Sequence, residues 1–153
     1  MALQISLTLP CKTYVAHYLR SKFGTTCCIN RTSAEGKMLF NLLTKARHER
    51  DAVAAKYSDS VEVLLAEGIY LRHGWELTPT AAQEFNTWLE DLLKDKFAIH
   101  VDALTSYGIK KAVAIRDFQD RYDFPEDVWK FETLKKYHDR LELRRDGGAL
   151  KVA

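Results

Sequence analysis

Residues Ile109 to Arg145 read IKKAVAIRDFQDRYDFPEDVWKFETLKKYHDRLELRR, a pattern that predicts two amphipathic helices in succession. Apolar residues recur every three or four positions in each half, which places them on one face of a helix. They are Ala112, Ile115, Phe118 and Tyr122 in the first half and Val128, Phe131, Leu134, Tyr137 and Leu141 in the second. The charged residues lie mostly off these faces. The pattern therefore favours a C-terminal helical hairpin.

A short bend at Asp123-Phe124-Pro125 separates the two predicted helices. Pro125 cannot continue the first helix, but it suits the first turn of the next one. Asp123, with Glu126 three residues later, fits an acidic variant of the capping box. Gly147-Gly148 is expected to end the second helix, because glycine readily adopts the conformation that follows a helix.

The chain before residue 109 predicts a mixture of strands and helices. Apolar residues alternate with polar ones from Leu3 to Leu9, which is typical of a half-buried strand that Pro10 then stops. The segment Lys12–Phe23 predicts a helix that ends at Gly24. The further elements expected are a short strand Thr25–Ile29, a long helix Ser33–Tyr57 with a capping box at Thr32–Glu35, a strand Val61–Leu65, a returning strand Ile69–Arg72, a helix Thr80–Phe97 capped by Thr78-Pro79, and a helical piece Ile99–Leu104. One continuous strand with a bulge at Gly68 is the alternative to the hairpin.

These elements predict an α+β fold that is predominantly helical, with a small antiparallel sheet and a C-terminal helical hairpin. We expect residues 1–108 to form an α+β core domain and residues 109–146 to form the helix-turn-helix-like hairpin within the same compact unit. Residues 147–153 are expected to be a frayed tail.

The composition is that of an ordinary globular protein. The 153 residues are 46% hydrophobic and 29% charged, and no apolar run is long enough to span a membrane. The N-terminus lacks the basic lead of a secretory signal. Three cysteines, Cys11, Cys27 and Cys28, give an odd number without a CxxC spacing, which favours a reducing, cytoplasmic setting.

The net charge is only +2, but it is unevenly distributed along the chain. Residues 1–57 carry nine Lys/Arg against three Asp/Glu, whereas residues 58–108 carry three against nine. Residues 109–153 carry eleven against nine. This segregation predicts either a basic face that meets an anionic partner or segments that neutralise one another within the monomer.

The search for catalytic chemistry is negative. The five histidines stand apart from one another and from the cysteines, and no phosphate-binding loop, dinucleotide fingerprint or nucleophile elbow occurs. A metal site assembled from Cys11, Cys27, Cys28 and one histidine is a minor alternative to three free thiols. We therefore expect a protein that is not an enzyme and needs no cofactor.

The residues AVAIRDFQDRYDFPEDVWKFETLKKYHDR, from 112 to 140, resemble the helix-turn-helix of small phage and mobile-element DNA-binding proteins. The resemblance covers about the last third of the chain and lacks the usual turn glycine. It implies that the second helix lies in the major groove with its N-terminal half toward the bases. Lys130, Thr133 and Trp129 would then lie near the bases. The residues toward phosphates would be Lys135, Lys136, Arg140, Arg144 and Arg145. The alternative is an ordinary helical hairpin packed on a core.

The N-terminal third resembles a ribbon-helix-helix protein in the residues ISLTLPCKTYVAHYLRSKFG and NRTSAEGKMLFNLL. In that family the strands of two subunits pair and enter the major groove, which would turn Gln4, Ser6 and Thr8 toward the bases. The segment TTCCI between the helices is longer than the motif allows. An N-terminal strand that pairs with Val61–Leu65 of the same chain is the favoured alternative.

Together these features predict a non-enzymatic DNA-binding protein, such as a regulator or accessory protein of a phage or mobile element, with a homodimer as a further expectation. Phosphate contacts would dominate, so that affinity falls steeply with salt. Further contacts are expected from the basic residues of the N-terminal segment, namely Lys12, Arg20, Lys22, Lys45 and Arg47. The alternative is a protein–protein adaptor or assembly subunit that binds no nucleic acid.

Overall fold

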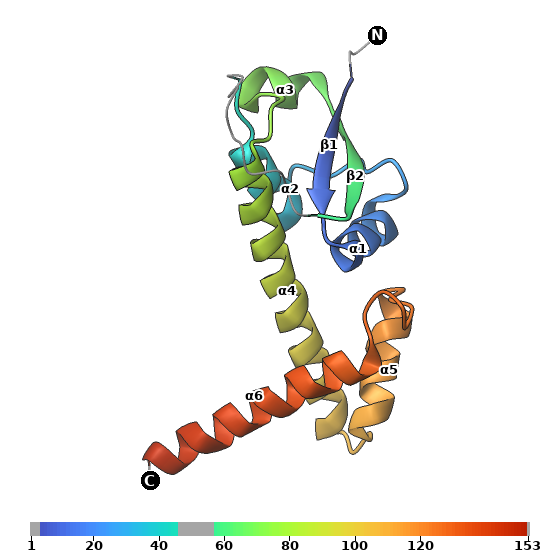
Figure 1. The fold of residues 1–153 in the computed structure, drawn as a ribbon, viewed down its shortest axis with the longest axis vertical. Coiled ribbons are helices and arrows are strands. Elements are labelled where there is room, and N and C mark those ends of the chain that lie inside the picture. Colours follow the sequence, from blue (N-terminus) through green and yellow to red (C-terminus); the bar gives the residue numbers. More distant parts are fainter. Residues whose placement is uncertain (1–3, 46–56, 153) are drawn as a thin grey trace. The chain divides into compact units, whose positions relative to one another are not determined.

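The computed structural model describes residues 4–45 and 57–152, with side chains as far as residue 146. Its elements are β1 (Ile5–Cys11), α1 (Thr13–Phe23), α2 (Ala34–Leu42), β2 (Asp59–Leu65), α3 (Glu67–His73), α4 (Pro79–Ser106), α5 (Lys111–Arg121) and α6 (Phe131–Val152) (Figure 1). This confirms the predicted mostly helical α+β fold. The chain forms two compact units, Met1–Leu92 and Leu93–Ala153, and α4 contributes to both.

The sheet of the first unit consists of β1 and β2, which pair antiparallel with Leu7 opposite Val63 and Leu9 opposite Val61. Alternate residues of both strands are buried, as their alternating polarity predicts. The predicted pairing of the N-terminal strand with Val61–Leu65 of the same chain is confirmed. The prediction that Pro10 stops the strand is wrong, because Pro10 lies within β1. An edge strand tolerates proline, since it has hydrogen bonds on one side only.

Helix α1 closely matches the predicted helix and buries Val15, Tyr18 and Leu19. It ends at Gly24, whose φ of 92° lies in the left-handed region that favours glycine. The predicted strand Thr25–Ile29 is reduced to a single parallel bridge between Cys27 and Val63 of β2.

Helix α2 is shorter than predicted. Ser33, and not Thr32, caps it, since Ser33 Oγ accepts a hydrogen bond of 3.0 Å from the backbone N–H of Gly36. The helix ends at Leu42, because Leu43 is extended and Thr44 pairs with Glu76 in an isolated antiparallel bridge. Most of the predicted continuation, residues 46–56, lies outside the described residues.

Helix α3 replaces the predicted returning strand Ile69–Arg72. The backbone N–H of Tyr70 donates to the carbonyl of Ala66, and Gly68 belongs to the helix and not to a turn. Tyr70 is buried while the neighbouring Leu71 is 57% exposed. A segment this short carries too few residues to separate a helical period from an alternating one.

Helix α4 is one continuous element, although the sequence predicted two pieces, Thr80–Phe97 and Ile99–Leu104. The predicted cap at its start is confirmed, because Thr78 Oγ1 accepts a hydrogen bond of 3.1 Å from the backbone N–H of Ala81. Its buried residues in the first unit include Phe85 and Leu89.

The second unit packs the end of α4 with α5 and α6. Phe118 is fully buried and makes edge contacts with Phe97 and Trp129, with ring centroids 5.1 and 6.0 Å apart. The two predicted helices of the hairpin are therefore present. Residues 122–130 between them form an irregular loop that is longer than the predicted bend.

The start and end of α6 differ from the prediction. Asp123 has a φ of 53° and does not cap a helix, and residues 126–128 form a turn. Glu126 caps α6 instead, since its two carboxylate oxygens accept from the backbone N–H of Phe131 at 3.1 and 3.0 Å. Rather than ending at Gly147-Gly148, α6 extends to Val152.

Candidate functional site

Two of the predicted N-terminal DNA contacts are paired with carboxylates of the first unit. Lys12 Nζ lies 2.8 Å from Glu90 Oε2. Arg20 Nη2 lies 3.3 Å from Asp59 Oδ1 and donates to the carbonyl of Ser60 at 2.7 Å. These side chains join α1 to α4 and to β2, so they do not form the free basic face that the charge distribution predicted.

Lys22 is paired as well. Its Nζ lies 2.9 Å from Glu35 Oε1, whose side chain is 1% exposed. Lys45 is exposed, and Arg47 lies outside the described residues. Acids of the same unit thus neutralise part of the N-terminal excess of positive charge. This agrees with the predicted alternative in which charged segments neutralise one another within the monomer.

The outward-facing residues of β1 also have hydrogen-bond partners within the sheet. Ser6 Oγ and Thr8 Oγ1 donate hydrogen bonds of 2.5 and 2.7 Å to the two carboxylate oxygens of Glu62 on β2. These bonds hold the pKa of Glu62 below its ordinary value. Ser6 and Thr8 therefore contribute to cross-strand pairing, and they do not present the unpartnered polar row that reading bases requires.

Helix α6 carries the remaining predicted bases, and they divide between its two flanks. Lys136, Arg140 and Arg144 are exposed and recur every four residues, which places them on one side of the helix about 6 Å apart along its axis. We call these three residues the basic stripe. Within residues 4–45 and 57–152, no carboxylate lies within ion-pair distance of them. Thr133, also exposed, lies at the N-terminal end of the stripe, and Lys130 directly precedes the helix.

Lys135 lies on the opposite flank. It precedes Asp139 by one turn, and its positive charge is one of the causes that lower the pKa of Asp139, the first being a hydrogen bond from Lys111. Lys111 Nζ contacts Asp139 and lies 3.1 Å from Glu142 Oε2. This flank of α6 is therefore an acidic surface neutralised by bases of the same unit.

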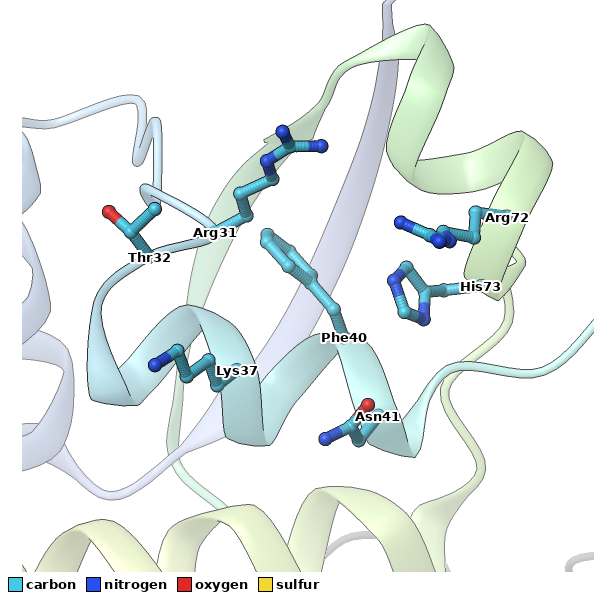
Figure 2. Close-up of a pocket in the computed structure, with 7 residues that line it drawn as sticks. All are labelled: Arg31, Thr32, Lys37, Phe40, Asn41, Arg72 and His73. Atoms are coloured by element: carbon cyan, nitrogen blue, oxygen red, sulfur yellow. The ribbon is translucent and has the colours of Figure 1, made fainter.

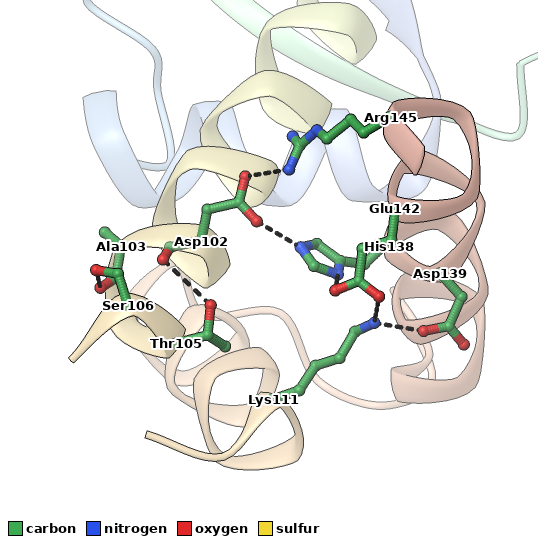
Figure 3. Close-up of polar contacts among 9 residues, drawn as sticks. All are labelled: Asp102, Ala103, Thr105, Ser106, Lys111, His138, Asp139, Glu142 and Arg145. Atoms are coloured by element: carbon green, nitrogen blue, oxygen red, sulfur yellow. Dashed lines mark hydrogen bonds and ion pairs between the residues drawn. The ribbon is translucent and has the colours of Figure 1, made fainter. Parts of the chain in front are cut away.

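Arg145, the last predicted phosphate contact, belongs to a polar cluster between α4 and α6 (Figure 3). Arg145 Nη1 lies 2.9 Å from Asp102 Oδ2, and His138 Nε2 lies 2.8 Å from Asp102 Oδ1. Burial alone raises the pKa of Asp102, but the hydrogen bonds from His138 and Arg145 hold it below its ordinary value. Arg145 is therefore occupied within the fold.

The pair formed by Asp102 and His138 is not arranged for catalysis. His138 is 1% exposed, and its Nδ1 lies 3.4 Å from Glu142 Oε1 without a hydrogen-bond partner in the described chain. Both ring nitrogens thus face carboxylates of the same unit, and the ring packs edge-on against Phe97. A general base must be within reach of the proton that it abstracts, and a ring that is 1% exposed offers neither nitrogen to a substrate. The contacts of His138 and Arg145 with Asp102 instead stabilise the packing of α6 on α4.

Trp129 does not reach toward a ligand. Only 8% of it is exposed, and its ring centroid lies 5.1 Å from that of Phe124 in an edge arrangement. Its carbonyl also accepts a hydrogen bond of 2.8 Å from Gln119. The assignment of Trp129 to the bases, which came from the helix-turn-helix resemblance, is therefore wrong.

The first unit also holds a pocket of about 290 Å³ that the sequence did not predict (Figure 2). Its lining residues come from the loop before α2, from α2 and from α3. They are Arg31, Thr32, Lys37, Phe40, Asn41, Arg72 and His73. Three of these side chains are cationic and exposed, and none of the described lining residues is acidic.

Two glycines set the walls of this pocket. A Cβ at Gly36 would lie 2.1 Å from the carbonyl oxygen of Asn30, so only glycine lets the loop pack directly on α2. A Cβ at Gly74, whose φ is 112°, would lie 2.2 Å from the carbonyl oxygen of Thr44. The one signal in the sequence was Gly36, an unfavourable residue in the first turn of a helix, which indicates a close backbone approach.

Other classes of site find no support in the part of the chain that the structure describes. No group of three or more His, Cys, Asp or Glu residues there could hold a metal ion. Cys11 and Cys27 are buried free thiols, and burial raises the pKa of Cys11 to about 12, which disfavours the reactive thiolate. None of the described helices is both long and apolar enough to cross a membrane.

Comparison with known proteins gives no family and no relative. No protein-family model, no curated protein and no solved structure matches this chain.

Proposed function

We propose that this chain is a non-enzymatic DNA-binding protein that contacts the phosphate backbone through the basic stripe of α6. The single observation that supports the proposal is a contrast in pairing. Lys136, Arg140 and Arg144 have no carboxylate partner in the described chain, whereas Lys12, Arg20 and Lys22 are paired. Cations that have no intramolecular partner are available to a polyanion.

The spacing of the stripe adds to this argument. Like charges four residues apart on a helix destabilise it by roughly 0.2–0.5 kcal/mol per pair. Lys136, Arg140 and Arg144 form two such pairs in succession. A row of phosphates would remove this repulsion. Thr133 and Lys130, near the start of the helix, would add hydrogen-bond donors. The regulatory or accessory role in a phage or mobile element is part of the same proposal.

Binding of duplex DNA in solution tests the proposal. The affinity of the whole chain for a fluorescent duplex, followed by anisotropy, should fall steeply between about 50 and 200 mM salt. Lys136→Gln should weaken binding, whereas Lys135→Gln, at the neighbouring exposed position beside the acids, should weaken it much less. Absence of binding at low salt, or equal effects of the two substitutions, would overturn the proposal.

A second candidate function is a protein–protein adaptor or homo-oligomeric assembly subunit. It is favoured by large apolar side chains on the surface of the second unit, where Ile99, Tyr107 and Val113 are 68%, 85% and 56% exposed. Large exposed apolar side chains are candidates for a protein interface where they form a contiguous patch. The DNA titration separates the two functions, because a DNA-binding homodimer is also an oligomer: no DNA binding at low salt, together with a defined oligomer by light scattering, would favour the adaptor.

A further inference from the structure

We propose that the pocket between the loop before α2, α2 itself and α3 binds a small phosphate monoester. This site lies in the first unit and is independent of the proposed DNA contact, which uses α6. The proposal rests on the charge, the donors and the size of the pocket, and on the backbone contacts that hold its walls.

Charge comes first. Arg31, Lys37 and Arg72 line the same pocket from three separate segments, and Figure 2 shows His73 next to Arg72, whereas the Lys37 side chain points to the other side. No carboxylate of the described chain lies within ion-pair distance of the three cations, although other bases of the same unit, such as Lys12, are paired. An anionic ligand would therefore meet three exposed positive charges that no carboxylate of the described chain neutralises.

The donors match a phosphate group better than a carboxylate. A phosphate monoester near pH 7 carries close to two negative charges and three acceptor oxygens. Two guanidinium groups, from Arg31 and Arg72, each offer a planar fork of N–H donors that fits phosphate oxygens in pairs. Lys37 adds a point charge, and the exposed amide of Asn41 adds neutral donors.

The size of the pocket selects a small ligand. A volume of about 290 Å³ lies at the lower end of the range for small-molecule sites. Phe40, which lines the pocket, is 3% exposed, and its ring centroid lies 6.3 Å from that of His73. A phosphate with a short organic group fits a volume of this size.

The walls are held in place before any ligand arrives. The loop that carries Arg31 rests on α2 at Gly36, where even a Cβ has no room. The end of α3, with Arg72 and His73, is fixed by Gly74 against the backbone of Thr44. A site formed in advance loses less conformational entropy when it binds.

Isothermal titration of the full chain with glycerol phosphate and with inorganic phosphate at pH 7.5 tests the proposal. We expect saturable one-to-one binding of glycerol phosphate. Arg31→Gln and Arg72→Gln should each weaken it at least tenfold, whereas Lys12→Gln, which removes a paired base of the same unit, should leave it unchanged. Thermal unfolding of each variant establishes that the fold is retained. Chemical shifts of the Asn41 side-chain amide and the His73 ring report binding at the pocket itself.

Three results would overturn the proposal. The first is no saturable binding of either phosphate up to roughly 10 mM. The second is binding that Arg31→Gln and Arg72→Gln do not affect. The third is that Arg31→Gln and Arg72→Gln weaken the binding of duplex DNA while the chain binds no glycerol phosphate, which would assign the pocket to DNA. Failure of α6 substitutions to change DNA affinity leaves this proposal intact, because the two sites share no residue.

Discussion

The Oη atom of Tyr18 donates a hydrogen bond of 2.7 Å to Oε1 of Glu35, and so ties α1 to α2 inside the first unit. Lys22 Nζ lies 2.9 Å from the same oxygen. Burial alone raises the pKa of Glu35, but the bonds from Tyr18 and Lys22 hold it below its ordinary value. A base that the sequence assigned to DNA thus serves as the counter-ion of a buried acid.

Loss of this counter-ion should destabilise the fold. Lys22→Met leaves the Glu35 carboxylate, 1% exposed, without its cationic partner, and we expect a loss of about 2 kcal/mol in the free energy of unfolding. Lys12→Met is the matched control, since Lys12 is paired with Glu90 at the surface and its loss should cost less than about 1 kcal/mol. Urea denaturation measures both. Equal losses would contradict the buried role of Glu35.

The close approach at Gly36 makes a second prediction. Gly36→Ala places a Cβ 2.1 Å from a backbone oxygen, so we expect a loss of about 2 kcal/mol or more. Gly68→Ala, within α3, meets nothing within 4 Å and should be neutral or stabilise by about 0.5–1 kcal/mol. Thermal unfolding of the two variants gives the comparison. A stable Gly36→Ala variant would show that the loop does not rest on α2.

The elements that the sequence predicted well are those with a long periodic segment or a strong signal at one end. The helix that became α1, the cap at Thr78 and the pairing of β1 with Val61–Leu65 depend on local patterns that packing reinforces. The predicted strand Ile69–Arg72 failed because so short a segment fits either period. The sequence predicted that the last helix starts at Pro125, but it begins at Phe131. A turn and the cap from Glu126 lie between the two positions.

The candidate site was predicted only in part, for a different physical reason. A basic residue in the sequence shows its charge but not its partner, so nothing distinguished Lys22, which faces Glu35, from Lys136, which has no such partner among the described residues. The pocket escaped prediction because Arg31, Lys37 and Arg72 belong to separate segments that only the tertiary fold brings together. Clustering in sequence does not determine clustering in space.

The orientation of α6 makes a third prediction. Leu134 is fully buried, whereas Leu143 on the same helix is 71% exposed. We expect Leu134→Ala to cost about 3–5 kcal/mol and Leu143→Ala to change the free energy of unfolding by less than about 0.5 kcal/mol. Denaturation of both variants checks the result. Similar costs would mean that α6 faces another way, and that the basic stripe is not exposed as described.

The cluster around Asp102 makes a prediction about pH. Its folded-state pKa lies below the ordinary value of 3.8, so folding favours the charged form. The stability that this group contributes is therefore fully present above pH 3.8 and is lost as the pH falls through the lower folded-state pKa.

Asp102→Asn should consequently be less stable than the unmodified chain near pH 6, and the difference should shrink toward about pH 2.5. Asp95→Asn, at an exposed position of the same helix, is the control and should show a small difference at both pH values. Urea denaturation followed by circular dichroism gives the free energies. A difference for Asp102→Asn that is constant across this pH range would contradict the assignment.

The most direct test of the central claim is the salt dependence of duplex DNA affinity in two triple variants that lower the net charge equally. One replaces Lys136, Arg140 and Arg144 by glutamine, and the other replaces the paired bases Lys12, Arg20 and Lys111 by glutamine. If the basic stripe contacts phosphates, the slope of log affinity against log salt should decrease by about three in the first variant and stay unchanged in the second. Equal slopes in the two variants, or no measurable binding by the unmodified chain at low salt, would contradict it.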